Sequence, residues 1–287
     1  MTDSPRDLFL DLPSQRSHLL DWGGPGGAHA VLFIHGLGSN VRTWNQVAPR
    51  VAAQFRVLAL DQRSHGLTPA PADNDFSYAA LCEDLHAVCS QLDLDQPVLV
   101  GHSWGGNVAI EYAVRYPDDV GGIAMLDGGF MGFSKVLGWP QFKAMVEQPR
   151  WSGASLTSYL DHARRHWGER YDASIQEEAM GNVVLRDDQT IVPHLDYDNL
   201  VRIQELEWQQ DDSLYAKVKC PALFLWCVPP EPHDRIVQQS LAWKRRTAAL
   251  IQTVLPQAEF KWLADSVHAV ALQSPALIAE EILCFAQ

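Results

Sequence analysis

The chain has 287 residues, of which 47% are hydrophobic and 20% charged, a composition typical of a globular protein. Its net charge of −13 argues against nucleic acid or an anionic membrane surface as its partner. Its apolar runs fall short of the ~20 residues of a membrane span, and the N-terminus lacks the pattern of a signal peptide. The five cysteines form no C-x-x-C motif, so we expect reduced thiols and a cytoplasmic protein.

The first half of the chain alternates strand-like and helix-like segments. An opening antiparallel pair is predicted at 8–10 and 17–20. Continuous apolar runs predict strands buried on both faces at 30–34, 56–60, 97–100 and 122–126. Helices are predicted between them at about 43–53, 77–92 and 106–113, the second capped by Ser77.

The alternation stops after the sixth predicted strand. Residues 130–219 are mostly helical in pattern, with no clear buried strand. It then resumes with a strand at 222–226, a helix at about 237–254, a strand at 260–263 and a helix from Pro275. We therefore predict a doubly wound α/β fold with a mostly parallel, eight-stranded sheet. Its core comprises residues 1–129 and 220–287, and residues 130–219 form a helical cap inserted after strand 6.

A G-x-S-x-G motif, Gly-His-Ser-Trp-Gly, occupies residues 101–105. An apolar strand-like run precedes it and a helix-like segment follows it. A serine on such a strand-to-helix turn has its hydroxyl exposed, and the N-terminus of the helix faces the same point. The setting predicts a nucleophile elbow with Ser103 as the nucleophile.

Two further motifs follow predicted strands. His-Gly-Leu-Gly at 35–38 follows the third strand, and Ala-Asp-Ser-Val-His at 264–268 follows the last. With the elbow motif, their order on this strand and helix pattern resembles the α/β-hydrolase superfamily, in its serine hydrolase branch. The resemblance covers nearly the whole chain. It implies that His268 is the base that activates Ser103, and histidine is suited to that task by its near-neutral pKa.

The resemblance also places the oxyanion hole. It implies that the backbone N–H groups of Leu37 and Trp104 stabilise the negative charge that develops during acyl transfer. No metal and no cofactor are expected, since serine acyl transfer requires neither. His162 and His166 share a helix face, but the neighbouring Arg164 and Arg165 argue against a metal pair.

The acid of the triad departs from the family's commonest pattern, Gly-x-x-Asp after the seventh strand. Here Cys227 replaces the glycine and Pro230 stands in place of the aspartate. Asp127 ends the sixth strand, where some family members carry their acid. We therefore predict Asp127 as the acid, with Glu231 or Asp234 as alternatives.

Candidate substrate-binding residues are less sharply defined. The aromatic residues Phe130, Trp139 and Trp167 lie in the predicted cap, where they either line an apolar pocket or pack the cap on the core. His35 either contacts substrate or supports its own loop by hydrogen bonding.

The predicted function is hydrolysis of an ester or lactone bond in a small, mostly apolar molecule through an acyl-enzyme on Ser103, an activity of the carboxylesterase type (EC 3.1.1). Serine at the elbow argues against the dehalogenase and epoxide hydrolase branches. Alternatives are an aminopeptidase of the proline iminopeptidase type, a carbon–carbon bond hydrolase, or a non-catalytic ligand-binding relative. The sequence leaves the natural substrate and the oligomeric state open.

Overall fold

The computed structural model describes residues 4–27, 29–230 and 235–287. Its main sheet has eight strands in the order β1-β2-β4-β3-β5-β6-β9-β10, parallel from β4 to β10. The strands are β1 Arg6–Asp11, β2 Arg16–Gly23, β3 Ala30–Ile34, β4 Arg56–Leu60, β5 Val98–His102, β6 Gly122–Leu126, β9 Ala222–Val228 and β10 Glu259–Ala264. The predicted α/β class and sheet are confirmed.

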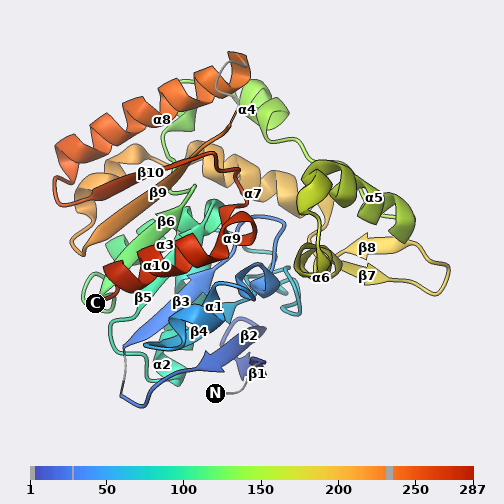
Figure 1. The fold of residues 1–287 in the computed structure, drawn as a ribbon, viewed down its shortest axis with the longest axis horizontal. Coiled ribbons are helices and arrows are strands. Elements are labelled where there is room, and N and C mark those ends of the chain that lie inside the picture. Colours follow the sequence, from blue (N-terminus) through green and yellow to red (C-terminus); the bar gives the residue numbers. More distant parts are fainter. Residues whose placement is uncertain (1–3, 28, 231–234) are drawn as a thin grey trace.

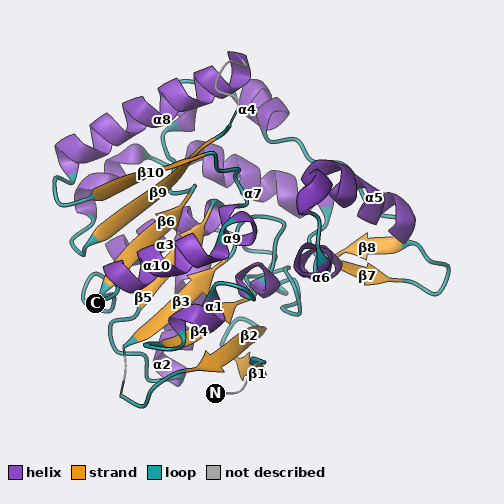
Figure 2. Ribbon diagram, in the orientation of Figure 1, coloured by secondary structure: helices purple, strands orange, loops and turns teal. Residues whose placement is uncertain are grey.

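Helices cover both faces of this sheet (Figures 1 and 2). They are α1 Ala48–Val51, α2 Tyr78–Gln91, α3 Trp104–Arg115, α8 Arg235–Val254, α9 Val270–Gln273 and α10 Pro275–Phe285. Buried side chains of α2, α3 and α8 form one apolar layer, and those of α1 and α10 form the other. The central strands β3, β5 and β6 are buried along their whole length, because helices pack on both sides of them.

The helix predicted at 43–53 is interrupted in the structure. A 3₁₀ turn, η1, spans Val41–Trp44, and α1 begins only at Ala48. Pro49 explains the break, because its ring would clash with the carbonyl of residue 45 in a continuous helix and it has no N–H to donate.

The segment between β6 and β9 carries further helices and a short hairpin. We call residues 130–219 the insertion, and its boundaries with the core remain our proposal. Its helical elements are η2 Phe133–Lys135, α4 Trp139–Met145, α5 Leu156–Trp167, η3 Gly168–Arg170, α6 Ala173–Met180, α7 Tyr197–Gln209 and η4 Asp212–Lys217. The sequence pattern missed the antiparallel pair β7 Val183–Leu185 and β8 Ile191–Pro193. In Figure 1, α5, α6 and this hairpin project to one side of the sheet.

The topology brings four loops to one edge of the sheet. The carboxyl ends of β3, β5, β6 and β10 lead into residues 35–38, Ser103, Asp127 and His268 respectively. Ligands of open α/β sheets bind at this edge, so the fold places the predicted site residues where such a site forms.

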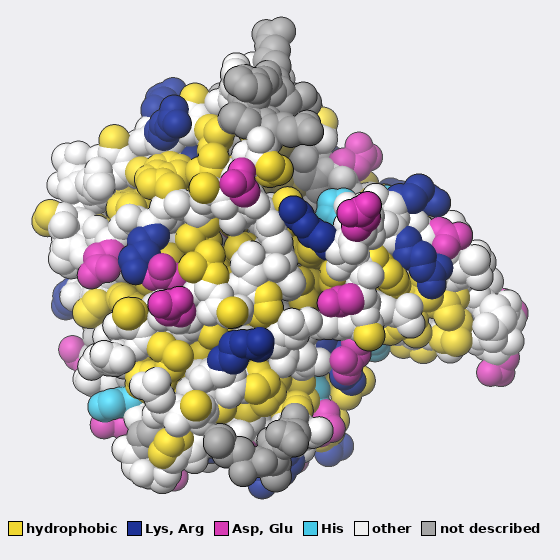
Figure 3. Space-filling view, viewed as in Figure 1, with side chains coloured by type: hydrophobic (Ala, Val, Ile, Leu, Met, Phe, Trp, Pro, Cys, Tyr) yellow, Lys and Arg dark blue, Asp and Glu magenta, His cyan; other side chains and the backbone are white. Residues whose placement is uncertain are grey.

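The surface is mixed in character. Acidic and basic side chains are interspersed with apolar ones over the face shown in Figure 3. Among the described residues, no helix has both the length and the apolar character needed to cross a bilayer.

Candidate active site

Ser103 occupies a sharp turn between β5 and α3. Its backbone has φ 52° and ψ −123°, a conformation that L-residues rarely adopt. The Ser103 N–H donates to the carbonyl of Leu126 at 2.9 Å, which ties the turn to β6. A Cβ atom at Gly101 would lie 2.2 Å from the Gly105 carbonyl oxygen, and one at Gly105 would lie 2.4 Å from that of Ile34. Both motif glycines are therefore required by close backbone packing.

His268 lies in the loop between β10 and α9 and contacts Ser103 and Asp127 at once. Its Nε2 is 3.0 Å from Oγ of Ser103, and its Nδ1 donates to Oδ2 of Asp127 at 2.8 Å. The imidazole is 59% exposed, whereas the Asp127 side chain is only 6% exposed. His268 is 141 residues from Asp127 and 165 from Ser103 in the sequence. The fold nevertheless brings the three side chains into one hydrogen-bonded chain.

The second oxygen of Asp127 is bound on the side away from His268. Oδ1 accepts from the backbone N–H of Cys227 at 2.9 Å and from Nζ of Lys244 at 2.5 Å. Burial alone would raise the pKa of Asp127. The hydrogen bond and charge of His268, together with the ammonium of Lys244, outweigh it and hold that pKa well below its usual range. Asp127 is therefore a carboxylate at neutral pH.

Of the three candidate acids, the structure describes only Asp127. Glu231 and Asp234 lie outside the described residues.

Leu37 and Trp104 border the same cavity as Ser103. Trp104 is the first residue of α3, where a backbone N–H has no partner within the helix. Among the described residues, the N–H of Leu37 also has no protein acceptor. Both groups are therefore free to donate to a ligand oxygen next to Ser103.

Two other histidines brace this region. His35 is fully buried, and its ring binds the carbonyl of Gly36 at 2.8 Å and the N–H of Gln62 at 3.0 Å. It is not among the cavity-lining residues, so of its two predicted roles the structure favours loop support. The His102 ring donates to the carbonyl of His268 at 2.8 Å, and burial followed by the charge of His268 lowers its pKa to about 4. His102 is thus neutral and anchors the loop of His268.

A cavity of about 840 Å³ opens above Ser103, between the sheet edge and the insertion. Its walls are mainly apolar and include Phe130, Phe133, Phe142, Met145 and Trp243. Of the predicted aromatic candidates, the structure brings Phe130 to this cavity. Trp139 packs instead against Phe142 and Trp208, and Trp167 lies beside His166 on α5.

Glu207 places a carboxyl group on the cavity wall, from α7. Within the described residues its side chain has no hydrogen-bond or ion-pair partner. Burial raises its pKa to about 7, although the charge of His268 acts in the opposite direction. This carboxyl therefore changes charge near neutral pH inside an apolar cavity.

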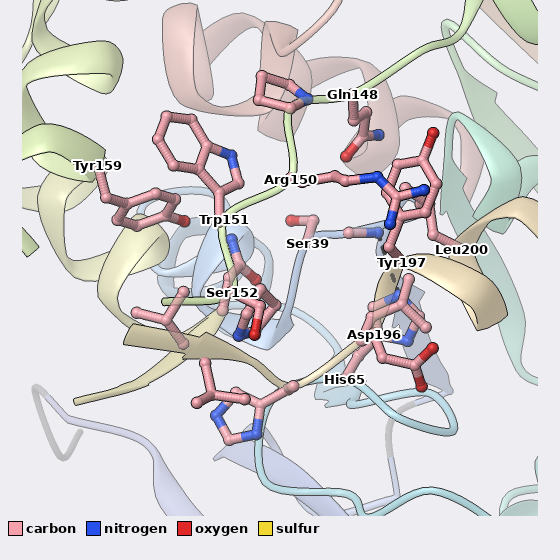
Figure 4. Close-up of a pocket in the computed structure, with 18 of the residues that line it drawn as sticks. Ser39, His65, Gln148, Arg150, Trp151, Ser152, Tyr159, Asp196, Tyr197 and Leu200 are labelled. Atoms are coloured by element: carbon pink, nitrogen blue, oxygen red, sulfur yellow. Dashed lines mark hydrogen bonds between the residues drawn. The ribbon is translucent and has the colours of Figure 1, made fainter. Parts of the chain in front are cut away.

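A second chamber of about 350 Å³ adjoins the first, and Ser39 and Gln148 line both. In Figure 4, Arg150 lies against the ring of Tyr197, and Trp151 faces Tyr159. The guanidinium carbon of Arg150 is 3.6 Å from the centroid of the Tyr197 ring. The chamber therefore combines aromatic side chains with polar and charged ones, among them His65, Asn182 and Asp196.

Sequence reasoning missed Lys244 and did not place Glu207. Lys244 carries a signal in its helical register, because Leu241, Thr247, Ala248 and Ile251 on α8 are all buried. A lysine in line with such a face is expected to bury at least its aliphatic stem, although the register does not name the partner of its ammonium. The apolar residues Phe133 and Phe142 gave no comparable signal, because an aromatic residue in a helical segment is more often part of the packing.

The fold and this arrangement define a hydrolase of the α/β class. The chain belongs to the alpha/beta hydrolase fold family, which matches residues 29–226.

Three comparisons place the chain among known proteins. Over 104 residues it is 38% identical to an uncharacterized protein, Rv2715, of Mycobacterium tuberculosis, covering 36% of this chain and 30% of that protein. The match thus spans less than a third of that relative's length. The crystal structure of E-2-(acetamidomethylene)succinate hydrolase superposes with a TM-score of 0.80 at 18% identity, over 98% of both chains. The carboxylesterase CesB of Bacillus subtilis has a TM-score of 0.70 at 17% identity, over 98% of this chain and 91% of that one. At these identities, the two structures share the fold.

Proposed function

We propose that this chain is a serine hydrolase that cleaves an ester or lactone bond of a small, mostly apolar substrate. The observation that carries the proposal is the hydrogen-bonded chain from Ser103 through His268 to the buried carboxylate of Asp127. This arrangement is that of a catalytic triad, in which the acid orients the histidine and the histidine activates the serine.

The proposed reaction has two halves. His268 takes the proton of Ser103 as Oγ attacks the carbonyl carbon, and the N–H groups of Leu37 and Trp104 stabilise the oxyanion. The tetrahedral intermediate collapses, His268 protonates the leaving alcohol, and an acyl-enzyme on Ser103 remains. Water, deprotonated by His268, then attacks the acyl group and releases the acid. Asp127 stays ionised throughout and stabilises the imidazolium.

The cavity supports a substrate that is apolar over most of its surface. Its aromatic and aliphatic walls favour burial of hydrocarbon, at roughly 25 cal/mol per Å². A carboxylesterase shares the fold, as does a hydrolase named for an acetamido compound. We rank an ester above an acetamido compound as the substrate, because the cavity is mostly apolar.

Glu207 favours one second candidate, an aminopeptidase of the proline iminopeptidase type. A carboxyl group without a protein partner in the cavity is suited to binding the amino group of a substrate. Turnover of a proline β-naphthylamide, with none of simple esters, would favour this candidate over the first.

The first test is hydrolysis of p-nitrophenyl esters from acetate to palmitate, with Ser103→Ala as the control. Activity that is lost in the variant supports the serine hydrolase, and the preferred chain length measures the cavity. A serine-directed phosphonate should add its mass to the wild type but not to Ser103→Ala. If it leaves the wild type unmodified and no ester, lactone or arylamide is cleaved, the proposal is wrong.

A further inference from the structure

Lys244 is a buried lysine that points at the acid of the proposed triad. It lies on α8 and is 7% exposed. Its Nζ donates to Oδ1 of Asp127 at 2.5 Å and to the carbonyl of Cys227 at 3.0 Å. The ammonium also lies 5.5 Å from the centroid of the Phe130 ring. Two hydrogen bonds and an aromatic face thus replace the water that this charge loses on burial.

The position of Lys244 determines which carboxylate oxygen faces His268. Lys244 and the N–H of Cys227 both bind Oδ1, so Oδ2 is left for Nδ1 of His268. A carboxylate held at one oxygen by two donors has little freedom to rotate. Lys244 itself is anchored to β9 through Cys227, and this fixes the carboxylate relative to the sheet.

We propose that Lys244 is a positioning residue that holds the Asp127 carboxylate in register with His268 and weakens its attraction for the imidazolium. The proposal rests on the proposed serine hydrolase function. Lys244 acts through Asp127 and takes part in no bond-making step.

Because Lys244 is charged, its removal should change the pH dependence of the reaction. Loss of a packing contact alone would not have this effect. Within residues 4–27, 29–230 and 235–287, the charged or titratable groups that face His268 are Asp127 from the end of β6, His102 from β5, Glu207 from α7 and, behind Asp127, Lys244 from α8. Removing Lys244 leaves the negative charge of Asp127 less compensated. The carboxylate then attracts the imidazolium of His268 more strongly, because no neighbouring cation offsets its charge.

The experiment measures the rate at which a fluorophosphonate labels Ser103 across pH, in the wild type and three variants. Lys244→Met keeps an unbranched side chain that is one atom shorter, and it removes the charge and the donors. Lys244→Gln removes the charge and keeps a donor. Arg245→Met removes the same charge from the next, exposed position of α8 and is the matched control. The folded fraction of each variant is measured by thermal unfolding.

We expect the acid limb of the labelling profile to move up by about one pH unit in both Lys244 variants. The plateau rate should fall about 10- to 100-fold in Lys244→Met and less in Lys244→Gln, a magnitude typical of partners that hold a site residue in place. Arg245→Met should match the wild type. Where Lys244→Met fails to fold, Lys244→Gln provides the same pH measurement.

If the wild type is labelled but the acid limb of its pH profile coincides with that of the Lys244 variants, the proposed role of Lys244 is wrong. The proposed serine hydrolase function would then still stand. The role of Lys244 is also wrong if the labelling rate of each variant falls only in proportion to its folded fraction. A wild type that is neither labelled nor active on any acyl substrate would overturn the proposed function, and the role of Lys244 with it.

Discussion

The backbone N–H of Cys227 donates to Oδ1 of Asp127 at 2.9 Å, across a gap of 100 residues in the sequence. Cys227 lies near the end of β9, the strand after which the commonest acid of the family follows. In this chain Cys227 donates to Asp127, which follows the neighbouring strand β6 and is the acid of our proposal. Asp127 has φ 39°, a left-handed conformation that turns its side chain back towards β9 and His268.

The first prediction concerns Asp127→Asn. The amide oxygen will stay on Cys227 and Lys244, because both are donors, so the amide NH₂ must face Nδ1 of His268. That nitrogen then has to accept, and the proton moves to Nε2, where it prevents His268 from taking the proton of Ser103. We expect kcat to fall by about 10⁴-fold.

Measured beside it, Glu231→Gln and Asp234→Asn should keep near-wild-type kcat on the preferred ester. If Asp127→Asn keeps near-wild-type kcat while either of the other two loses it, the assignment of the acid is wrong.

The second prediction follows from the pKa of Glu207, which is raised to about 7 from an ordinary value of 4.5. The carboxyl is neutral below that pH and negative above it. An ester that carries a carboxylate should therefore bind less well as pH rises, by about three- to tenfold in KM between pH 6 and pH 8 relative to a neutral ester. A cationic ester should show the opposite trend.

Glu207→Gln should make the KM ratio of anionic to neutral ester independent of pH. Glu205→Gln, an exposed change on the same helix, should leave the trend of the wild type intact. A ratio that does not vary with pH in the wild type would contradict this account of Glu207.

The sequence predicted the strands of the core accurately and the mostly helical character of the insertion, but it did not predict the hairpin in the insertion. Strands 30–34, 56–60 and 122–126 have the predicted bounds, because a strand buried on both faces is mostly apolar; only the partly buried Arg56, at the start of β4, departs from this pattern. The hairpin of β7 and β8 has three residues per strand, and part of β7 is exposed, so no such run marks it. Short elements that are stabilised by their neighbours leave little pattern in the sequence.

The residues of the candidate site also differ in how far the sequence could predict them. Ser103 and His268 lie in motifs whose glycine and loop residues are required by local geometry, so pattern could find them. Asp127 could be inferred because a strand end at the carboxyl edge is a favourable position for an acid. Lys244 could not be inferred from residue type, since lysine on a helix is usually exposed. Its partner lies 117 residues away, a pairing that only the folded chain reveals.

The third prediction concerns strain at Ser103. Its φ and ψ cost about 1–3 kcal/mol for a residue with a Cβ atom, and glycine adopts them freely. Glycine also costs about 0.4–1 kcal/mol of additional unfolded-chain entropy. Ser103→Gly should therefore be more stable than Ser103→Ala by about 1 kcal/mol, or roughly 2 °C in Tm. Both variants lack the hydroxyl and should be inactive. The difference between their Tm values, measured by calorimetry, therefore reports the strain of the backbone at residue 103. Equal Tm values would mean that the turn holds no such strain.

The fourth prediction concerns the second chamber. Because Ser39 and Gln148 border both spaces, we expect a long acyl chain that fills the cavity above Ser103 to extend into the chamber lined by Trp151 and Tyr159. Trp151→Ala removes apolar surface from the chamber but leaves the walls of the first cavity unchanged. Loss of about 1.5 kcal/mol of burial should raise KM roughly tenfold for the longest p-nitrophenyl esters and leave the acetate unaffected. Trp167→Ala, in the same insertion but outside both linings, is the control. If Trp151→Ala raises KM equally for acetate and palmitate, the effect comes from displacement of the insertion, and the chamber does not receive the acyl chain.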